Sequence, residues 1–275
     1  MMPVVHFFQS LSFTQCTILL PLLLATLVFI MPWVRKSLGI EVAGEMSDSA
    51  NEAFGAIALF FVFIAASSLT TVQGFQKDGQ KVTEVELAHI TNLDRELVRI
   101  DSERAVKARL HLKTYMTAII EKEWKTMENG LPSDDVEAAL GQLISTINHM
   151  EEDKKVSEKM LESLEGHLEK VSDSRDERIQ VSNLHLSFIY WDMIFAFIGI
   201  LIVISFFYHT AVPKRIGLAG KMIALAFTLV LIIQTDGVFY GDIAIKPTAY
   251  SASLAKMKIR TMDTASSPSE SPNKS

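Results

Sequence analysis

The residues best suited to chemistry lie in one acidic stretch, IIEKEWKTMENG, at positions 119–130. It carries Glu121 and Glu123 beside Trp124, and two carboxylates next to an aromatic ring could act as a catalytic acid and base. Residues two positions apart on a helix point to different faces, so the two glutamates are poorly placed to act as one pair. We therefore predict a structural role for this stretch, with Trp124 as an apolar anchor and Gly130 at the helix end.

No other motif predicts catalysis or cofactor binding. The sequence contains no nucleophile elbow, phosphate-binding loop, dinucleotide-binding glycine pattern or metal-ligand spacing. Its single cysteine, Cys16, rules out an intrachain disulfide. A net charge of −6 gives no reason to expect nucleic acid as a partner. We expect a protein that is not an enzyme, has no cofactor or metal and binds no nucleic acid.

Hydrophobic residues make up 49% of the chain and are concentrated in four long runs. A membrane helix needs roughly 20 mostly apolar residues. The candidate spans are residues 17–34, 52–72, 186–209 and 216–240. We therefore predict a multi-pass protein whose first partner is the lipid bilayer.

Polar residues at the edges of these runs are candidate sites, because ionisable groups at membrane depth are costly. They are Asn51, Glu52, Asp192 and Asp236. The alternative is that they are interfacial caps and anchors, which applies more to Glu52 and Asp236 than to the deeper Asp192, and a glutamate at a helix N-terminus is favourable without any function.

Two arginines precede the third span, at positions 175 and 178. Arg175 and Arg178 could pair with an acidic partner near the membrane, or form a ring that attracts anions in an oligomer. The alternative, which we favour, is that both side chains are solvated on a charged helix face.

The charged middle of the chain predicts helices outside the membrane. Apolar residues at 90, 93, 97 and 100 form one helix face, and the segment from 76 to 128 has no proline, which predicts one long helix. Asn129-Gly130 favours a left-handed cap, and Pro132 stops the helix. Two further amphipathic segments follow, and the acidic stretch at 119–130 should then form the tip farthest from the membrane.

The predicted fold is all-α: four transmembrane helices, with an extramembrane helical hairpin or three-helix bundle inserted between helices two and three. The expected parts are membrane helices one and two at 1–74, the helical domain at 75–185, helices three and four at 186–245, and a C-terminal segment at 246–275. The Ser/Pro-rich composition after about residue 264 predicts disorder.

Four segments in order, at 49–76, 119–130, 171–182 and 232–247, resemble the bestrophin-like family of bacterial multi-pass membrane proteins. The shared features are an Asn-Glu pair leading the second span, the Glu-x-Glu-Trp stretch, the arginine-bearing segment, and an Asp ahead of an aromatic and a glycine. The family is similar to bestrophins, which are pentameric anion channels with four membrane helices and a helical cytosolic domain. The resemblance covers about residues 15–258.

The resemblance implies an anion path lined by the second span, where aromatic residues narrow a bestrophin pore. This span offers phenylalanines at 54, 60, 61 and 63. The chain departs from the family at Asp192, where an apolar residue is usual, and a negative charge near the path would oppose anion conduction.

Two functions from different classes are therefore open. The first is a homo-oligomeric anion channel, with chloride as a possible ion, in a bacterial inner (plasma) membrane. The second is a membrane-anchored structural or signalling module that binds protein partners through its helical domain.

The orientation has conflicting indications. The positive-inside rule counts basic residues in loops, and those at 35, 36, 214 and 215 would put the helical domain outside. Basic residues at 77, 81, 175 and 178, and the similarity to bestrophins, place that domain in the cytoplasm, which is the orientation we expect.

Overall fold

The computed structural model describes residues 3–42, 44–153, 155–208 and 211–266. The C-terminal residues 267–275, most of the segment expected to be disordered, lie outside them. The described residues are helices and connecting turns, so the all-α class is confirmed. The chain divides into two compact units. We call Met1–Lys77 with Leu184–Ala244 the membrane unit, and Asp78–Asn183 with Ile245–Ser275 the helical unit.

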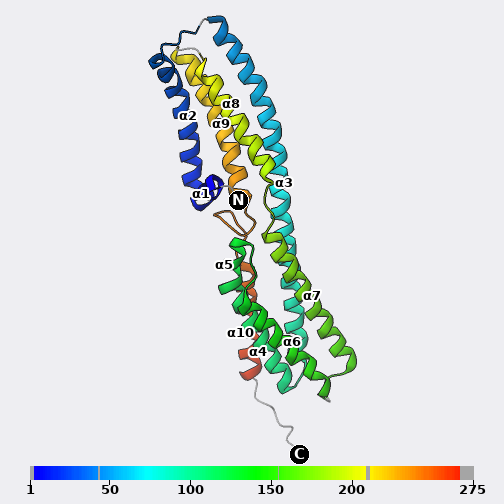
Figure 1. The fold of residues 1–275 in the computed structure, drawn as a ribbon. Coiled ribbons are helices and arrows are strands. Elements are labelled where there is room, and N and C mark those ends of the chain that lie inside the picture. Colours follow the sequence, from blue (N-terminus) through cyan, green and yellow to red (C-terminus); the bar gives the residue numbers. More distant parts are fainter. Residues whose placement is uncertain (1–2, 43, 154, 209–210, 267–275) are drawn as a thin grey trace, which may run out of the picture. The chain divides into compact units, whose positions relative to one another are not determined.

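The membrane unit contains four helices long and apolar enough to cross a bilayer. They are α2 (Phe13–Ser37), the first part of α3 (Gly44–Arg99), α8 (Phe188–Phe206) and α9 (Val212–Thr235). A short helix α1 (Pro3–Ser10) precedes them (Figure 1). The four predicted spans are thus confirmed as candidate membrane helices.

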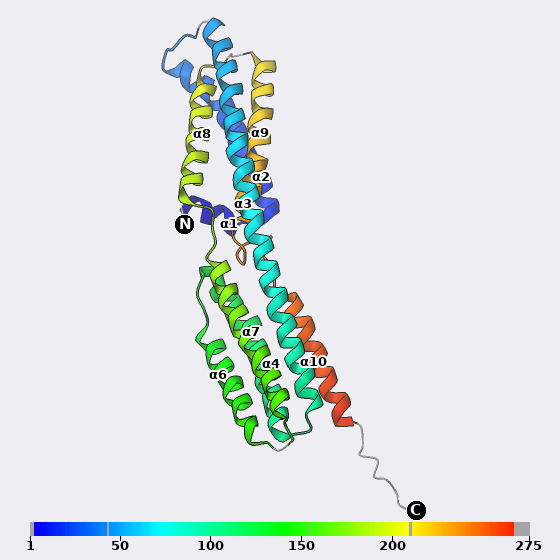
Figure 2. The same ribbon diagram turned by 90° about the vertical axis from the view of Figure 1, so that its right-hand side faces the viewer.

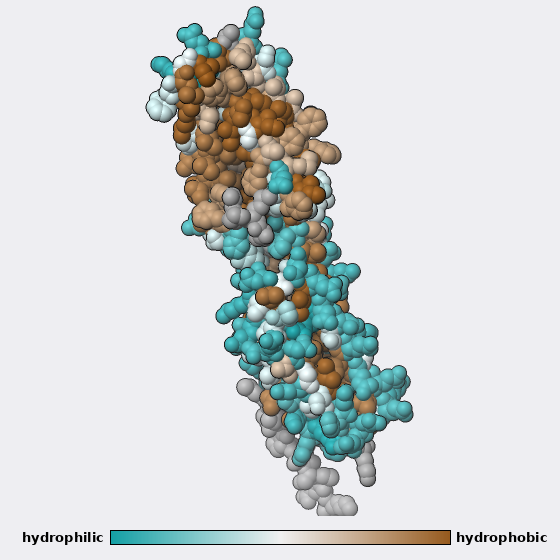
Figure 3. Space-filling view, in the orientation of Figure 1, coloured by the Kyte–Doolittle hydropathy of each residue, from teal (hydrophilic) through white to brown (hydrophobic). Residues whose placement is uncertain are grey.

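The core of the membrane unit is formed where these helices face one another. Phe54 and Phe61 of α3, Trp191 of α8, and Leu24 and Met222 of α2 and α9 are buried in one hydrophobic cluster. Apolar side chains also cover the face of this unit that is seen in Figure 3, where the surface is mostly brown. An apolar exterior is expected where lipid rather than water is the solvent.

The helical unit begins with the second part of α3 and reverses direction at residues 100–102. There α3 ends at Arg99, and Ser102 caps α4 (Glu103–Ala118) by accepting a hydrogen bond from the Arg104 backbone N–H. Two side-chain pairs show that α3 and α4 are antiparallel, because Asp94 bonds Arg109 and Glu86 bonds Tyr115. The prediction of one helix from 76 to 128 is therefore wrong.

The chain then passes through short turns before two more long helices. A π-helical turn η1 (Ile119–Glu123), α5 (Trp124–Thr126) and a 3-10 turn η2 (Met127–Asn129) end at Gly130, whose φ of 68° confirms the left-handed cap. Helices α6 (Asp134–Asn148) and α7 (Glu158–Ser182) follow, joined through the 3-10 turn η3 (His149–Glu152). Helix α6 packs against α4 and α7.

The last described helix, α10 (Thr248–Ser266), also belongs to the helical unit and packs against α4 (Figure 2). It follows the membrane helices in sequence, so the helical unit is assembled from one segment that precedes α8 and α9 in the chain and one that follows them. The sequence had placed residues 246–275 in a separate terminal segment.

Candidate functional site

Four charged side chains are buried together inside the helical unit. Arg175 and Arg178 come from α7, Glu86 from α3 and Glu123 from η1. All four are at most 2% exposed. We call these four residues the charged cluster.

Each arginine of the charged cluster is bound by carboxylates. Arg178 donates from Nε to Glu86 at 2.6 Å and from Nη2 to Glu123 at 2.7 Å. Arg175 donates from Nε and Nη2 to Glu123 Oε1 at 3.0 and 2.8 Å, and also pairs with Glu137. Glu123 thus bridges the two guanidinium groups, and two positive charges face two buried negative charges. Charge-assisted bonds of this kind are the strong ones in protein interiors.

The positions follow from helix periodicity. On α7 the buried residues Leu164, Leu168 and Val171 are four and three apart, and Arg175 and Arg178 continue that spacing. On the other side, Glu86 lies one helical turn before the buried Ile90 of α3. The side chains therefore point inward with the apolar face of each helix.

Two tyrosines complete the surroundings of Glu86. Tyr115 Oη donates to Glu86 Oε1 at 3.0 Å, and Tyr250 Oη donates to Oε2 at 2.7 Å. Burial and the Glu86 charge raise the pKa of both phenols well above the ordinary value. Both therefore stay protonated as donors, and Tyr250 connects α10 to α3.

Trp124 lies against the same cluster. Its Nε1 donates to the Ile245 carbonyl at 3.0 Å, and its ring stands edge-on to Tyr250 with centroids 5.3 Å apart. The Arg178 guanidinium carbon lies 5.5 Å from the ring centroid, within cation–π range. Trp124 therefore joins the turn that follows α4 to Ile245, Arg178 and Tyr250 within the helical unit, and this turn lies at the other end of α4 from the reversal at 100–102.

Glu121 and Gly130, the other residues of the family stretch, lie outside the cluster. Glu121 is exposed, whereas Glu123, two positions on, is fully buried, so the two carboxylates do face apart. The Gly130 carbonyl accepts a hydrogen bond from Asn183 Nδ2 at 2.9 Å, which ties the turn to the end of α7.

The electrostatics of the cluster indicate a structural role. Burial alone would raise the pKa of Glu123, but the charges and hydrogen bonds of Arg178 and Arg175 lower it below the ordinary value. The preferred prediction for both arginines, a solvated helix face, is wrong, because each guanidinium is enclosed and neutralised. An anion could bind either arginine only by displacing a carboxylate that is already paired with it.

Polar residues of the membrane unit gather around Asn51. Its Oδ1 accepts hydrogen bonds from Tyr208 Oη and, at 3.3 Å, from Lys221 Nζ. A cavity of about 240 Å³ lies here, lined by residues that include Asn51, Tyr208, Lys214 and Lys221. Asp48, also in the lining, pairs with Lys214 at 3.4 Å. We call this the Asn51 cavity. Glu52, the next residue, is exposed on α3.

Asp236 and Asp192 have opposite environments. Asp236 caps α9, is 1% exposed and accepts a hydrogen bond from the Leu186 backbone N–H, which ties the end of α9 to the segment that leads into α8. Asp192 is exposed in the second turn of α8. The lining of the Asn51 cavity includes neither Asp192 nor Asp236, and Arg175 and Arg178 belong to the helical unit.

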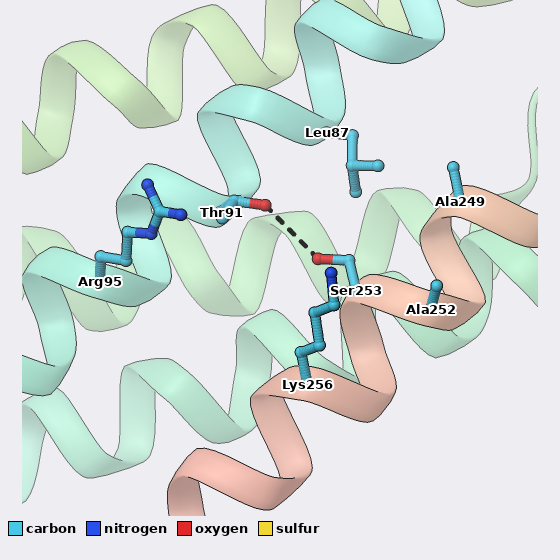
Figure 4. Close-up of a pocket in the computed structure, with 7 residues that line it drawn as sticks. All are labelled: Leu87, Thr91, Arg95, Ala249, Ala252, Ser253 and Lys256. Atoms are coloured by element: carbon cyan, nitrogen blue, oxygen red, sulfur yellow. Dashed lines mark hydrogen bonds between the residues drawn. The ribbon is translucent and has the colours of Figure 1, made fainter.

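A groove in the helical unit runs between α3 and α10 (Figure 4). Thr91 Oγ1 and Ser253 Oγ lie 3.4 Å apart across it. Exposed Arg95 and Lys256 stand beside them, and the volume is about 680 Å³. Among the described residues, no group of three His, Cys, Asp or Glu side chains is arranged to hold a metal ion.

Sequence reasoning did not identify Glu86, Tyr115 or Tyr250 as members of a site. Helix periodicity could have indicated their burial. A charged residue at a position that continues an apolar helix face is a candidate for burial with a partner of opposite charge. Glu86 and the arginines of α7 all have that placement.

Comparison with solved structures shows the fold. A bacterial bestrophin homologue from Klebsiella pneumoniae that carries one substitution is 11% identical, with a TM-score of 0.69 over 91% of this chain and 99% of that one. A second structure of the Klebsiella pneumoniae homologue is 12% identical, with a TM-score of 0.67 over 90% and 98%. No curated protein matches the sequence.

The sequence itself matches a family model, that of the bestrophin-like domain, over residues 21–250. The match contains all four candidate membrane helices, apart from the first residues of α2, and the whole charged cluster. The chain is thus a membrane protein, and it belongs to the bestrophin-like family.

Proposed function

We propose that this protein is the subunit of a homo-oligomeric anion channel, with chloride among its permeant ions. The observation that carries the proposal is the aromatic surface of α3 within a bestrophin fold. Phe60 and Phe63 are 61% and 72% exposed, whereas Phe54 and Phe61 are buried in the core of the membrane unit. Two rings are therefore free to narrow a path bounded by neighbouring copies, as the family resemblance implies for the second span.

The Asn51 cavity supports an anion path. It combines a phenol, an amide and two lysines, and its only carboxylate among the lining residues is Asp48, which is already paired with Lys214. Cationic and hydrogen-bond-donating linings favour anions in pores. Asp192, which would oppose anions, lies on α8 and not on α3.

The alternative of an anchored module that only binds partners is not favoured, since the family and the fold are bestrophin-like and the similarity to bestrophins implies an anion channel. The charged cluster also has a sufficient role inside the helical unit, where it joins α3, η1, α7 and α10.

Anion flux from purified protein in liposomes tests the proposal. We expect chloride flux from the unmodified protein and little flux of a large organic anion such as gluconate. Phe63→Ala should raise chloride flux severalfold and admit the larger anion, because it removes a ring from the narrow path. Phe227→Ala is the matched control, since Phe227 is 44% exposed on α9. Absence of flux from folded, inserted protein, or equal effects of the two substitutions, would overturn the proposal.

We also propose that the helical unit faces the cytoplasm of a bacterial cell, with the membrane unit in its plasma membrane. The similarity to bestrophins supports this orientation, while the basic residues of the short loops favour the opposite one.

Cysteine labelling decides the orientation. In a Cys16→Ser background, Asp135→Cys reports on the helical unit and Glu41→Cys on the loop after α2, since both native residues are exposed. We expect an impermeant thiol reagent to label position 41 in intact cells and position 135 only after permeabilisation. The reverse pattern would place the helical unit outside.

A further inference from the structure

A second cationic cavity lies in the membrane unit, between the end of α2 and the start of α9. Its volume is about 710 Å³. Its basic residues are Arg35, Lys36 and Arg215, and Glu41 is the one acidic residue in its lining. Trp33 and Ile40 contribute apolar surface. We call it the α2 cavity.

Arg35 is the residue of the α2 cavity whose buried positive charge is least compensated by its surroundings. It is 8% exposed and donates from Nη1 to the Tyr208 carbonyl at 3.1 Å and the Phe206 carbonyl at 3.5 Å. Its Nε has no hydrogen-bond partner, and no carboxylate lies within 4.0 Å of its guanidinium among the residues that the structure describes. Carbonyl dipoles only partly offset a buried positive charge, so an anion beside it would be strongly favoured.

The surroundings indicate that this anion carries apolar chains. Trp33 is 72% exposed at the end of a membrane helix, where tryptophan commonly lies at the level of lipid headgroups. Further along α2, toward its N-terminus, Ile30, Phe29 and Leu22 are each more than 40% exposed. A lipid could therefore lie along α2 with its headgroup at the cavity.

We propose that the α2 cavity binds the phosphate of an anionic glycerophospholipid, with Arg35 and Lys36 as its main charged contacts and Trp33 beside the glycerol region. The two basic residues that α2 contributes, Arg35 and Lys36, outnumber Glu41, the one acidic residue in the lining. Basic pockets between membrane helices bind anionic headgroups by the same electrostatics. The site is independent of the proposed anion path, because it requires no flux.

Lipid binding to the full-length protein in detergent tests the proposal, by native mass spectrometry and by the shift in unfolding temperature. The probes are phosphatidylglycerol, phosphatidylcholine of the same chain length, and inorganic phosphate. We expect phosphatidylglycerol to bind and stabilise the protein, with the other two much weaker. Equal binding of both lipids, or an equal effect of inorganic phosphate, would overturn an anionic-lipid site.

Substitutions of the α2 cavity residues test whether the phosphatidylglycerol binds there. Lys36→Gln should weaken phosphatidylglycerol binding by roughly fivefold, the effect expected of one basic residue near an anionic surface. Arg35→Gln should weaken it further. If Arg35→Gln does not fold, Lys36→Gln combined with Trp33→Ala replaces it. Lys107→Gln is the control, since Lys107 is exposed on α4 of the helical unit. Unchanged binding in the α2 variants, or the same loss in the control, would refute the assignment.

Discussion

The two units bury arginine in different ways. In the helical unit, Arg178 is fully enclosed and two carboxylates neutralise it. In the membrane unit, Arg35 is nearly as buried but its guanidinium faces backbone carbonyls. A guanidinium whose charge is balanced by its own chain holds helices together, whereas one balanced only by dipoles still attracts an anion. Burial of a charge alone therefore does not distinguish a structural residue from a ligand-binding one.

The largest loss of stability should come from removing an arginine of the charged cluster. Arg178→Gln leaves Glu86 buried without its arginine and Glu123 with Arg175 alone, and loss of one member of a buried pair costs about 3–5 kcal/mol of unfolding free energy. Thermal unfolding in detergent, followed by circular dichroism, should show a large fall in midpoint. Arg35→Gln sharpens the comparison, because it leaves no buried carboxylate and should cost about 1 kcal/mol. Equal losses from both substitutions would remove the distinction between the two sites.

Removal of one hydroxyl should have a smaller effect. Tyr250→Phe deletes the donor to Glu86 Oε2, a hydrogen bond to a charged group that is worth about 1.5–3 kcal/mol. Because Tyr250 holds α10 to α3, amide hydrogen exchange in α10 should quicken more than exchange in α6. Tyr190→Phe in α8 is the control, and matching exchange in both variants would show that the phenol does not hold α10.

The next largest loss of stability should come from a substitution in the turn at Gly130. Gly130→Ala forces a left-handed φ on an L-residue, and its Cβ would lie 2.0 Å from Asn183 Oδ1. We expect a loss of about 1–2 kcal/mol in the same unfolding assay. Gly166→Ala in α7 has open space around its Cβ and should instead be neutral or stabilising. A stable Gly130→Ala protein would mean that the turn relaxes freely.

The smallest expected effect is a dependence of the protein's stability on pH. The folded-state pKa of Glu123 is lowered, so its contribution to stability is fully present above the unfolded-state pKa of about 4.3 and is lost as pH falls through the folded-state value. Unfolding midpoints measured from pH 6 to pH 3 should fall for the native chain. Glu123→Gln should start lower and fall less steeply. Parallel curves would show that Glu123 has no part in the acid response.

The sequence predicted one unit better than the other, for a physical reason. The membrane helices are defined by apolar runs such as residues 52–72, where composition alone determines the structure. The reversal at Ile100–Ser102 has no glycine or proline, so the apolar face of α3 seemed to continue, although Asp101-Ser102-Glu103 is an acceptable helix start.

The charged cluster was harder to predict, because its ion pairs join residues 52–92 positions apart. Arg175 and Arg178 were identified as candidates, but their partners were not. No local pattern links Glu86 to α7, and a charge on a helix is usually solvated. The spacing of Leu164, Leu168 and Val171 was the one local feature that could have revealed the burial of the arginines.

The bond from Tyr250 to Glu86 also orders the protein's biogenesis. The two residues are separated by 164 positions, and both membrane helices α8 and α9 are synthesised between them. While the chain is emerging from the ribosome, Glu86 can meet Arg178 before it can meet Tyr250. The helical unit can therefore acquire its final hydrogen bonds only after translation has passed the last membrane helix, which makes its completion a late step that follows synthesis of every membrane span.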